Sequence, residues 1–332
     1  MKNLNRIYYS VRPFIPRWLA IELRRLVVRA KLRKYRDVWP IDQCASKPPP
    51  GWPGWPDGKR FALVLTHDVD TARGQDNCIE LAKMENEAGF ISSFNFVCRR
   101  YQLSPDVFEF LKEQGFEIGV HGVYHDGKKF DCREEFRDRA SIINECLVQW
   151  NSVGFRSPAM QRNMEWMHDL NIEYDSSTFD TDPFEPQPDG ACTIFPFLVT
   201  SADGAQSFVE LPYTLPQDFT LFVMMKHSDI RIWKEKLDWL VSKGGMVLIN
   251  THPDYMSFGD QPLGREEYPS ILYKDFLEYV REKYEGQYWH CLPRDLARFA
   301  KGWLSDGNSS SSSLEEKARL HRKVKHDSTL SI

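Results

Sequence analysis

Short apolar runs alternate with helical segments from Phe61 onward, and this alternation constrains the fold more than any other feature of the chain. Seven apolar runs have the length and composition of strands, at 61–66, 93–97, 116–120, 155–157, 172–176, 208–212 and 246–250. Segments of helical period lie near 75–88, 104–114, 132–150, 162–170, 229–243 and 270–284. About seven βα units with short connections predict an α/β fold, in which helices cover a parallel sheet that is open or closed into a barrel.

Composition divides the chain into four parts. Residues 1–46 form a basic arm, and residues 47–59 form a connector rich in Pro, Gly and Trp that cannot enter the interior of a helix or sheet. The main α/β domain is expected over 60–304, with the turn-rich stretch 177–207 as an insertion over one face. Residues 305–332 contain a Ser run and many charges, and we expect them to form a flexible tail.

Charge is distributed unevenly along the chain. The formal net charge of −4 argues against a nucleic-acid binder, but residues 1–36 contain eleven Lys or Arg and one acid, Glu22, so this segment carries +10. An amphipathic helix is predicted over 17–35, and the basic segment 17–36 fits an anionic membrane surface. The alternative is that the apolar stripe of this helix packs on the main domain.

Cysteine use and the lack of an export signal bear on location. The seven Cys residues are odd in number, scattered, and never in C-x-x-C spacing, which argues against a disulfide framework and a cysteine-based zinc site. The chain has no stretch with the features of a secretory signal and no apolar run long enough to span a bilayer. We therefore expect a cytoplasmic protein, peripheral on the inner membrane face if its basic arm binds lipid.

Two groups of ionisable residues follow predicted strands, where parallel α/β folds place their functional sites. Asp68 and Asp70 end the strand 61–66, and two such carboxylates can serve as a metal ligand and a base, although Asp is also common in turns. His121 and His125 follow the strand 116–120, and two His four residues apart can meet one metal. Two His and one carboxylate make a metal site with open positions for water and substrate.

Three further residues end other predicted strands. Arg156 can orient a carboxylate, or it can form a structural ion pair that holds a loop. Asp175 can cap a turn. His252 ends the strand 246–250, and it becomes a general acid only if a carboxylate raises its pKa; otherwise it is a hydrogen-bonded structural residue.

These five groups, in this order and each at a strand end, resemble the motifs of polysaccharide deacetylases of the NodB-homology type, over residues 60–300. The resemblance implies a distorted (β/α) barrel of about seven parallel strands. It also implies that Asp70, His121 and His125 bind one divalent metal ion. Zn²⁺ is expected, and Co²⁺, Ni²⁺ and Fe²⁺ suit the same ligands.

The resemblance also assigns catalytic roles. It implies that Asp68 is the general base and that Arg156 orients it. His252 would be the general acid that protonates the leaving amine, with Asp175 as the acid that tunes it. The backbone N–H near Ala159 corresponds to the family's oxyanion donor.

The sequence departs from the family's common pattern at four places. Asp68 and Asp70 are spaced D-x-D rather than adjacent, which puts the division of their roles in doubt. Gly122 replaces the usual Ser or Thr, Met160 stands where Gly is often found, and Phe179 replaces a Trp that lines the acetyl pocket. None of these changes removes a predicted ligand or acid–base group.

Other residues have weaker assignments. His67 points away from Asp68 along a strand, so it is expected to be packed or hydrogen-bonded rather than a ligand. The segment 210–218 is a candidate for the substrate groove through Tyr213 and Asp218. Trp52 and Trp55 could stack on sugar rings or pin the connector to the domain.

The predicted function is metal-dependent hydrolysis of N-acetyl groups on a carbohydrate, with an N-acetylated sugar or glycan as substrate. One alternative is a hydrolase of another amide, such as a cyclic imide or ureide. Another is a non-catalytic glycan-binding protein on the same fold.

Overall fold

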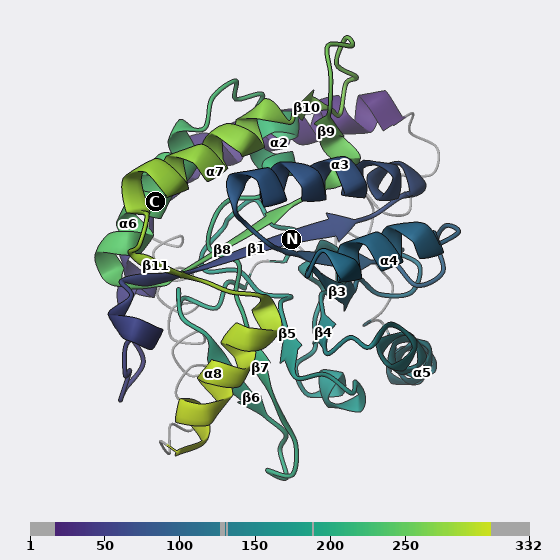
Figure 1. Ribbon diagram of the computed structural model, residues 1–332, viewed down its shortest axis with the longest axis vertical. Helices are drawn as coiled ribbons and strands as arrows, with labels where there is room; N and C mark the ends of the chain where they lie inside the picture. Colours follow the sequence, from purple (N-terminus) through teal and green to yellow (C-terminus); the bar gives the residue numbers. More distant parts are fainter. Residues whose placement is uncertain (1–16, 127–129, 131, 188, 307–332) are drawn as a thin grey trace, which may run out of the picture.

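A nine-stranded, mostly parallel sheet lies at the centre of the protein (Figure 1). The computed structural model describes residues 17–126, 130, 132–187 and 189–306. The strands are β1 (Phe61–Val69), β2 (Ser93–Phe96), β3 (Glu117–Val120), β4 (Gly154–Phe155), β5 (Tyr174–Asp175), β6 (Phe197–Thr200), β7 (Ser207–Glu210), β8 (Met246–Thr251) and β11 (Tyr288–His290). The sheet curls into a half-barrel with helices around it.

Strand β1 organises the sheet because it pairs along nearly its whole length. β8 pairs with residues 62–67 of β1, while β11 and β2 pair with residues 61–63 and 66–69. The part of β1 that pairs with β8 overlaps the parts that pair with β11 and with β2. β8 therefore lies along one edge of β1, and β11 and β2 share the other edge. The parallel strands then follow as β8-β1-β2-β3-β4-β5-β7. These are the seven strands predicted from the sequence.

Four strands were not predicted. β6 pairs antiparallel with β7, and β11 is only three residues long. A separate two-stranded ladder joins β9 (Met256–Ser257) and β10 (Tyr268–Pro269). β6 lies in the stretch 177–207 that was expected to be an insertion, and its residues are only half-buried. β9, β10 and β11 are only two or three residues long, too short for a sequence pattern to indicate a strand.

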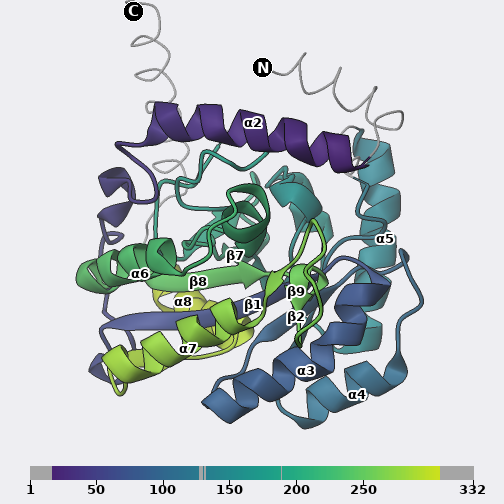
Figure 2. The ribbon, with the colours of Figure 1, turned by 90° about the horizontal axis from the view of Figure 1, so that it is seen from above.

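Helices surround the curved sheet, as the view from above shows (Figure 2). They are α2 (Arg17–Tyr35), α3 (Ala72–Ala88), α4 (Pro105–Glu113), α5 (Arg133–Trp150), α6 (Arg231–Lys243), α7 (Ile271–Tyr284) and α8 (Pro293–Asp306). The Ser104 side chain caps α4, and α6 ends at Gly244 in the left-handed conformation. None of the described helices combines the length and apolar character that a membrane crossing requires.

The helix predicted over 162–170 is wrong, and α8 was not predicted. Only a 3-10 turn forms at Trp166–Asp169. The side chain of Asn144 on α5 donates to the Asp169 carbonyl and accepts from the Asn171 N–H, and these bonds end the turn. Of the two terminal segments, residues 1–16 of the predicted arm and 307–332 of the predicted tail lie outside the described part of the chain.

The connector 47–59 is held to the domain by aromatic packing. The rings of Trp52 and Trp55 lie 4.6 Å apart, and Trp52 also contacts Phe299 and Trp303. The Trp55 indole is buried and donates a 2.8 Å hydrogen bond to the Gly244 carbonyl. Two roles were considered for these tryptophans, stacking on sugar rings and holding the connector to the domain. The structure supports the second.

We predict that Trp55→Ala lowers the free energy of unfolding by about 3–5 kcal/mol, because it opens a cavity and leaves the Gly244 carbonyl without its donor. Urea unfolding followed by far-UV circular dichroism measures this change. Val148→Ala is the control: this side chain is 78% exposed, so the effect should stay within about 0.5 kcal/mol. A Trp55→Ala effect as small as that of the control would contradict the anchoring role.

Candidate functional site

Four parallel strands deliver the predicted site residues to one edge of the sheet. β1 carries Asp68 and ends just before Asp70; β3 is followed by His121, β4 by Arg156 and β8 by His252. The carboxyl ends of parallel strands meet at the same edge, so five side chains far apart in sequence gather there. The site is therefore a direct consequence of the strand order.

The extended backbone of β1 sorts its polar residues between two faces. Asp68 and Asp70 are two residues apart and lie on one side. His67 points to the other side, where it is fully buried and hydrogen-bonded at 2.7 Å to the Thr251 hydroxyl and at 2.9 Å to the Glu85 carboxylate. The expectation that His67 is a packed, hydrogen-bonded residue is confirmed.

Asp70, His121 and His125 form a group that could hold a metal ion. One ligand atom of each residue lies within 4.8 Å of the other two. Asp70 Oδ1 is 3.3 Å from His121 Nε2 and 3.1 Å from His125 Nε2. Asp70 and His121 are buried, whereas the His125 side chain is 25% exposed, so the group reaches solvent through His125.

The surroundings of the Asp70 Oδ1 atom indicate whether these residues fit a metal ion. It is buried, and no described residue gives it a hydrogen bond of acceptable geometry, although both imidazoles are close. A buried carboxylate oxygen without a donor is costly. Burial also favours the neutral acid, but the charge of His125 and the proximity of His121 outweigh it and hold the pKa of Asp70 well below its ordinary value. The donor set therefore fits one divalent cation.

His121 is held in the tautomer that a metal ligand requires. Its Nδ1 lies 3.0 Å from the main-chain oxygen of Arg156. Because a carbonyl only accepts, Nδ1 carries the proton and Nε2 presents its lone pair toward Asp70. Burial lowers the pKa of His121, which favours the neutral ring.

The turn after β3 explains one departure from the family pattern. Gly122 has a φ of +73°, a conformation that Ser or Thr adopts only with strain. Its carbonyl accepts a hydrogen bond from the Cys98 N–H at 2.9 Å. Gly at this position thus suits the path of the backbone that leads to His125, which itself has a φ of +55°.

Asp68 is fixed by three hydrogen bonds. Asn95 Nδ2 and an Arg156 terminal nitrogen donate to its Oδ1 at 3.0 and 3.2 Å, and Asn250 Nδ2 donates to its Oδ2 at 2.8 Å. Burial alone would raise the pKa of Asp68, but the proximity of His121, the charges of Arg156 and His252 and the bond from Asn95 lower it to about 2. The expected contact of Arg156 with Asp68 is present.

The two asparagines were not singled out in the sequence. Asn95 is in the four-residue strand β2, and Asn250 is in β8. A polar amide inside an apolar strand run is the signal that could have identified them. Gly119 on the neighbouring strand leaves room for Asn95, since a Cβ there would lie 2.0 Å from the Asn95 Oδ1.

His252 is paired with Asp218. Its Nδ1 lies 2.7 Å from Asp218 Oδ1, and its main-chain N–H donates to Asp218 Oδ2 at 2.8 Å. Tyr268 also donates to Oδ2, at 2.9 Å. Burial opposes the charged imidazole, but the charge of Asp218 and its hydrogen bond, helped by Asp70 and Asp68, raise the pKa of His252 to about 10. His252 is therefore an imidazolium at neutral pH.

The prediction that Asp175 tunes His252 is wrong. The Asp175 carboxylate instead accepts hydrogen bonds from the Ser177 hydroxyl at 2.6 Å and the Ser177 main-chain N–H at 3.1 Å. The reason lies in the sheet: β5 pairs with β4 and β7, whereas the segment that leads to Asp218 hydrogen-bonds to β8. Asp218, noted in the sequence only as a groove candidate, occupies the position expected for Asp175.

The remaining candidates are two residues of the turn after β4 and two buried aromatic side chains. Ala159 and Met160 both have a positive φ, of 54° and 52°, in the turn after β4, and two such non-Gly residues in succession are strained. Phe179 is buried against the Tyr213 ring. Tyr213 is fully buried and donates to Glu185 at 2.6 Å, so it supports the structure and does not line an open groove.

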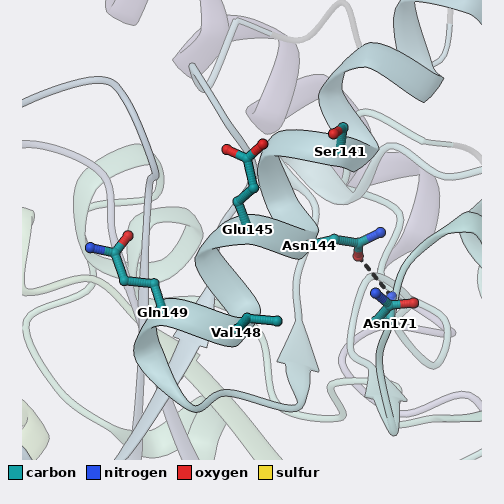
Figure 3. A pocket seen from close by; sticks show the side chains of 6 residues that line it. All are labelled: Ser141, Asn144, Glu145, Val148, Gln149 and Asn171. Atoms are coloured by element: carbon teal, nitrogen blue, oxygen red, sulfur yellow. Dashed lines mark hydrogen bonds between the residues drawn. The ribbon is translucent and has the colours of Figure 1, made fainter.

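An open hollow elsewhere on the surface contains none of the candidate site residues (Figure 3). It lies on α5 and is lined by Ser141, Asn144, Glu145, Val148, Gln149 and Asn171. Glu145 is its single ionisable side chain, so it offers no acid–base pair and no metal-ligand set.

We predict that His252 keeps its proton up to a pH of about 10 in the wild type. Asp218→Asn should lower the pKa of His252, because burial disfavours the charged imidazole and the carboxylate that offsets this effect is gone. Asp175→Asn should leave the titration unchanged. The pKa is raised on folding, so the charged ring stabilises the fold below about pH 6.5, and this contribution is lost as the pH rises toward 10.

Chemical shifts of labelled histidine rings, followed by NMR across this pH range, measure the titration. An Asp218→Asn protein in which His252 titrates as in the wild type would refute the pairing. So would an equal shift in Asp175→Asn.

Several solved structures share the fold. A protein of Mycobacterium smegmatis described as a polysaccharide deacetylase has a TM-score of 0.57 at 20% identity, over 75% of this chain and 93% of its own. One of Pseudomonas aeruginosa PAO1, described in the same way, has a TM-score of 0.60 at 17% identity, over 80% and 98%. Puue allantoinase has a TM-score of 0.61 at 17% identity, over 80% and 98%. No protein-family model and no curated protein sequence matches the chain. The chain thus has the (β/α) barrel fold of the polysaccharide deacetylases, as predicted.

Proposed function

We propose that the protein removes the acetyl group from an N-acetylated sugar or glycan by metal-dependent hydrolysis. One observation carries the proposal. A ligand set for one divalent ion, an ionised carboxylate held by three donors and an imidazolium paired with a carboxylate are gathered at one edge of the sheet. Amide hydrolysis needs each of these parts.

Asp70, His121 and His125 would hold the metal, and we expect zinc at this site. Co²⁺, Ni²⁺ and Fe²⁺ suit the same donor set. When bound, a divalent ion polarises the amide carbonyl and makes water more acidic. The buried Asp70 and the fixed tautomer of His121 present their lone pairs without prior rearrangement, which favours tight binding.

Asp68 and His252 would carry the acid–base chemistry. Asp68, with a pKa lowered to about 2, is ionised at neutral pH, so it can accept a proton from the attacking water. His252 donates its proton to the leaving nitrogen as the C–N bond breaks, because an amide nitrogen leaves only as an amine. Arg156 and Asp218 act through these two residues as positioning groups.

Two kinds of substrate agree with the fold. The neighbours described as polysaccharide deacetylases support an N-acetylated carbohydrate. Puue allantoinase, which is equally similar, supports a second candidate, the opening of a cyclic ureide or imide. Both reactions attack a non-peptide amide, so the same acid, base and metal ligands serve either. The five motif groups that resemble those of the deacetylases favour the first candidate.

We predict that the zinc- or cobalt-loaded protein releases acetate from N-acetylglucosamine oligomers and does not open a cyclic ureide such as allantoin. His252→Gln should lower kcat by about 100- to 10,000-fold, because the leaving amine loses its proton donor. His168→Gln is the control, since His168 lies outside the candidate site and should retain activity. Acetate is measured by an enzyme-coupled assay.

The products separate the alternatives. If the protein opens the ring of the ureide and releases no acetate, the second candidate function, hydrolysis of a cyclic ureide or imide, is supported instead. A metal-loaded protein that yields neither product, but binds acetylated oligomers, would favour the non-catalytic glycan-binding alternative. An unchanged kcat in His252→Gln would contradict the role of the general acid.

A further inference from the structure

Helix α2 packs on the domain through one face. Ile21 is buried, and Val28 and Leu32 are half-buried against the core. The Arg25 guanidinium donates to the Val223 and Arg265 carbonyls at 3.1 Å, and the Lys31 ammonium donates to the Pro183 carbonyl at 2.9 Å. The helix thus packs on the main domain, but not through the stripe predicted from the sequence: Leu19, Leu23, Leu26 and Ala30 are exposed.

The opposite face of α2 carries a second apolar stripe. Leu19, Leu23, Leu26 and Val27 are 37%, 42%, 58% and 55% exposed, and Ala30 beside them is also exposed. With 3.6 residues per turn, these five positions fall within an arc of about 100° that excludes the buried side chains. Figure 2 shows α2 along the outside of the molecule, with the domain on one side of it.

Basic side chains flank this outer stripe along one edge and at its C-terminal end. With 3.6 residues per turn, Arg29 and Arg33 lie beside the stripe on one side, and Lys34 follows Ala30 one turn further along it; all three are exposed. The single acid of the helix, Glu22, is hydrogen-bonded to Arg25. The outer face of α2 is therefore apolar along its centre, with positive charge along one edge and at its C-terminal end.

We propose that this outer face binds the surface of an anionic lipid bilayer. The leucines and Val27 would enter the boundary between headgroups and acyl chains, and Arg29, Arg33 and Lys34 would contact the acidic headgroups. An anionic bilayer matches both properties of this face. Apolar side chains alone would bind acidic and neutral lipid equally well, and cations alone would bind acidic groups without an apolar stripe beside them.

A second copy of the chain fits this face less well. In a twofold contact the helix would meet itself, so the cations beside one stripe would approach those beside the other. No acidic side chain on the outer face of α2 is free to neutralise them, since Glu22 already pairs with Arg25. Acidic lipid headgroups supply the missing negative charge.

Binding at this face would reach the candidate site through a direct structural connection. α2 packs on the π-helical segment η6 (Phe219–Met224), and the Arg24 guanidinium lies 6.0 Å from the Phe219 ring centre. This segment begins immediately after Asp218, the partner of His252. Helix α2 would thus lie between a bound bilayer and the element that fixes the proposed general acid.

Vesicle sedimentation with the full chain tests the proposal. Phosphatidylcholine vesicles that contain phosphatidylserine should bind the wild type, pure phosphatidylcholine vesicles should bind it far less, and added salt should weaken binding. Leu23→Ser/Leu26→Ser should lower the binding constant at least tenfold, and Arg29→Gln/Arg33→Gln/Lys34→Gln should do the same. These side chains are exposed, so the melting temperature should stay at the wild-type value.

Matched variants elsewhere on the surface serve as controls. Val148→Ser/Ile271→Ser removes two exposed apolar side chains, and Lys112→Gln/Lys243→Gln/Lys301→Gln removes three exposed cations. Both control proteins should bind vesicles as the wild type does. Wild-type affinity in the α2 variants, or equal binding to neutral and acidic vesicles, would overturn the proposal. A dimer in analytical ultracentrifugation that the Leu23→Ser/Leu26→Ser change dissociates, without vesicle binding, would assign the face to a second copy instead.

Discussion

The buried guanidinium of Arg156 connects the parts of the candidate site. It donates to Asp68, to the Asn250 side-chain oxygen and to the Ser176 hydroxyl and carbonyl, so the ends of β1, β4, β5 and β8 meet around one cation. The main-chain oxygen of the same residue fixes the tautomer of His121. A buried cation is tolerated only when it is paired and fully hydrogen-bonded. The pairing that satisfies Arg156 also keeps Asp68 ionised and orients a metal ligand.

Environment gives similar carboxylates different roles in this protein. Asp68 has three donors and two nearby cations, and its pKa falls to about 2. Asp175 and Glu210 are also buried but have fewer donors, and burial raises the pKa of both. Asp218 accepts from Tyr268 and from two groups of His252, and its negative charge is what keeps that ring protonated. Burial pushes Asp68, Asp175 and Glu210 toward the neutral acid, and only at Asp68 do nearby charges and hydrogen-bond donors outweigh it.

The sequence allowed the parallel strands and the metal-ligand candidates to be predicted, because both depend on local pattern. A fully buried parallel strand is a continuous apolar run, and polar residues directly after it lie at the functional edge. The two histidines and the Asp68/Asp70 pair could therefore be named from the pattern, and the family resemblance assigned Asp70 to the metal. The partner of His252 could not, since Asp175 and Asp218 both follow strands and the choice depends on which segment lies beside β8. The failed helix at 162–170 has the same cause: contacts with Asn144 on α5 override the local periodicity.

The measurement that tests the central claim most directly is the amount of metal bound per chain, determined by elemental analysis after incubation with zinc and gel filtration. We expect close to one zinc per wild-type chain and a sharp loss in His125→Ala, which removes the partly exposed ligand. His168→Ala, outside the site, should bind as the wild type does. A wild type that retains no zinc or cobalt, or a His125→Ala protein that retains as much as the wild type, would contradict the assignment of these three residues as a metal site.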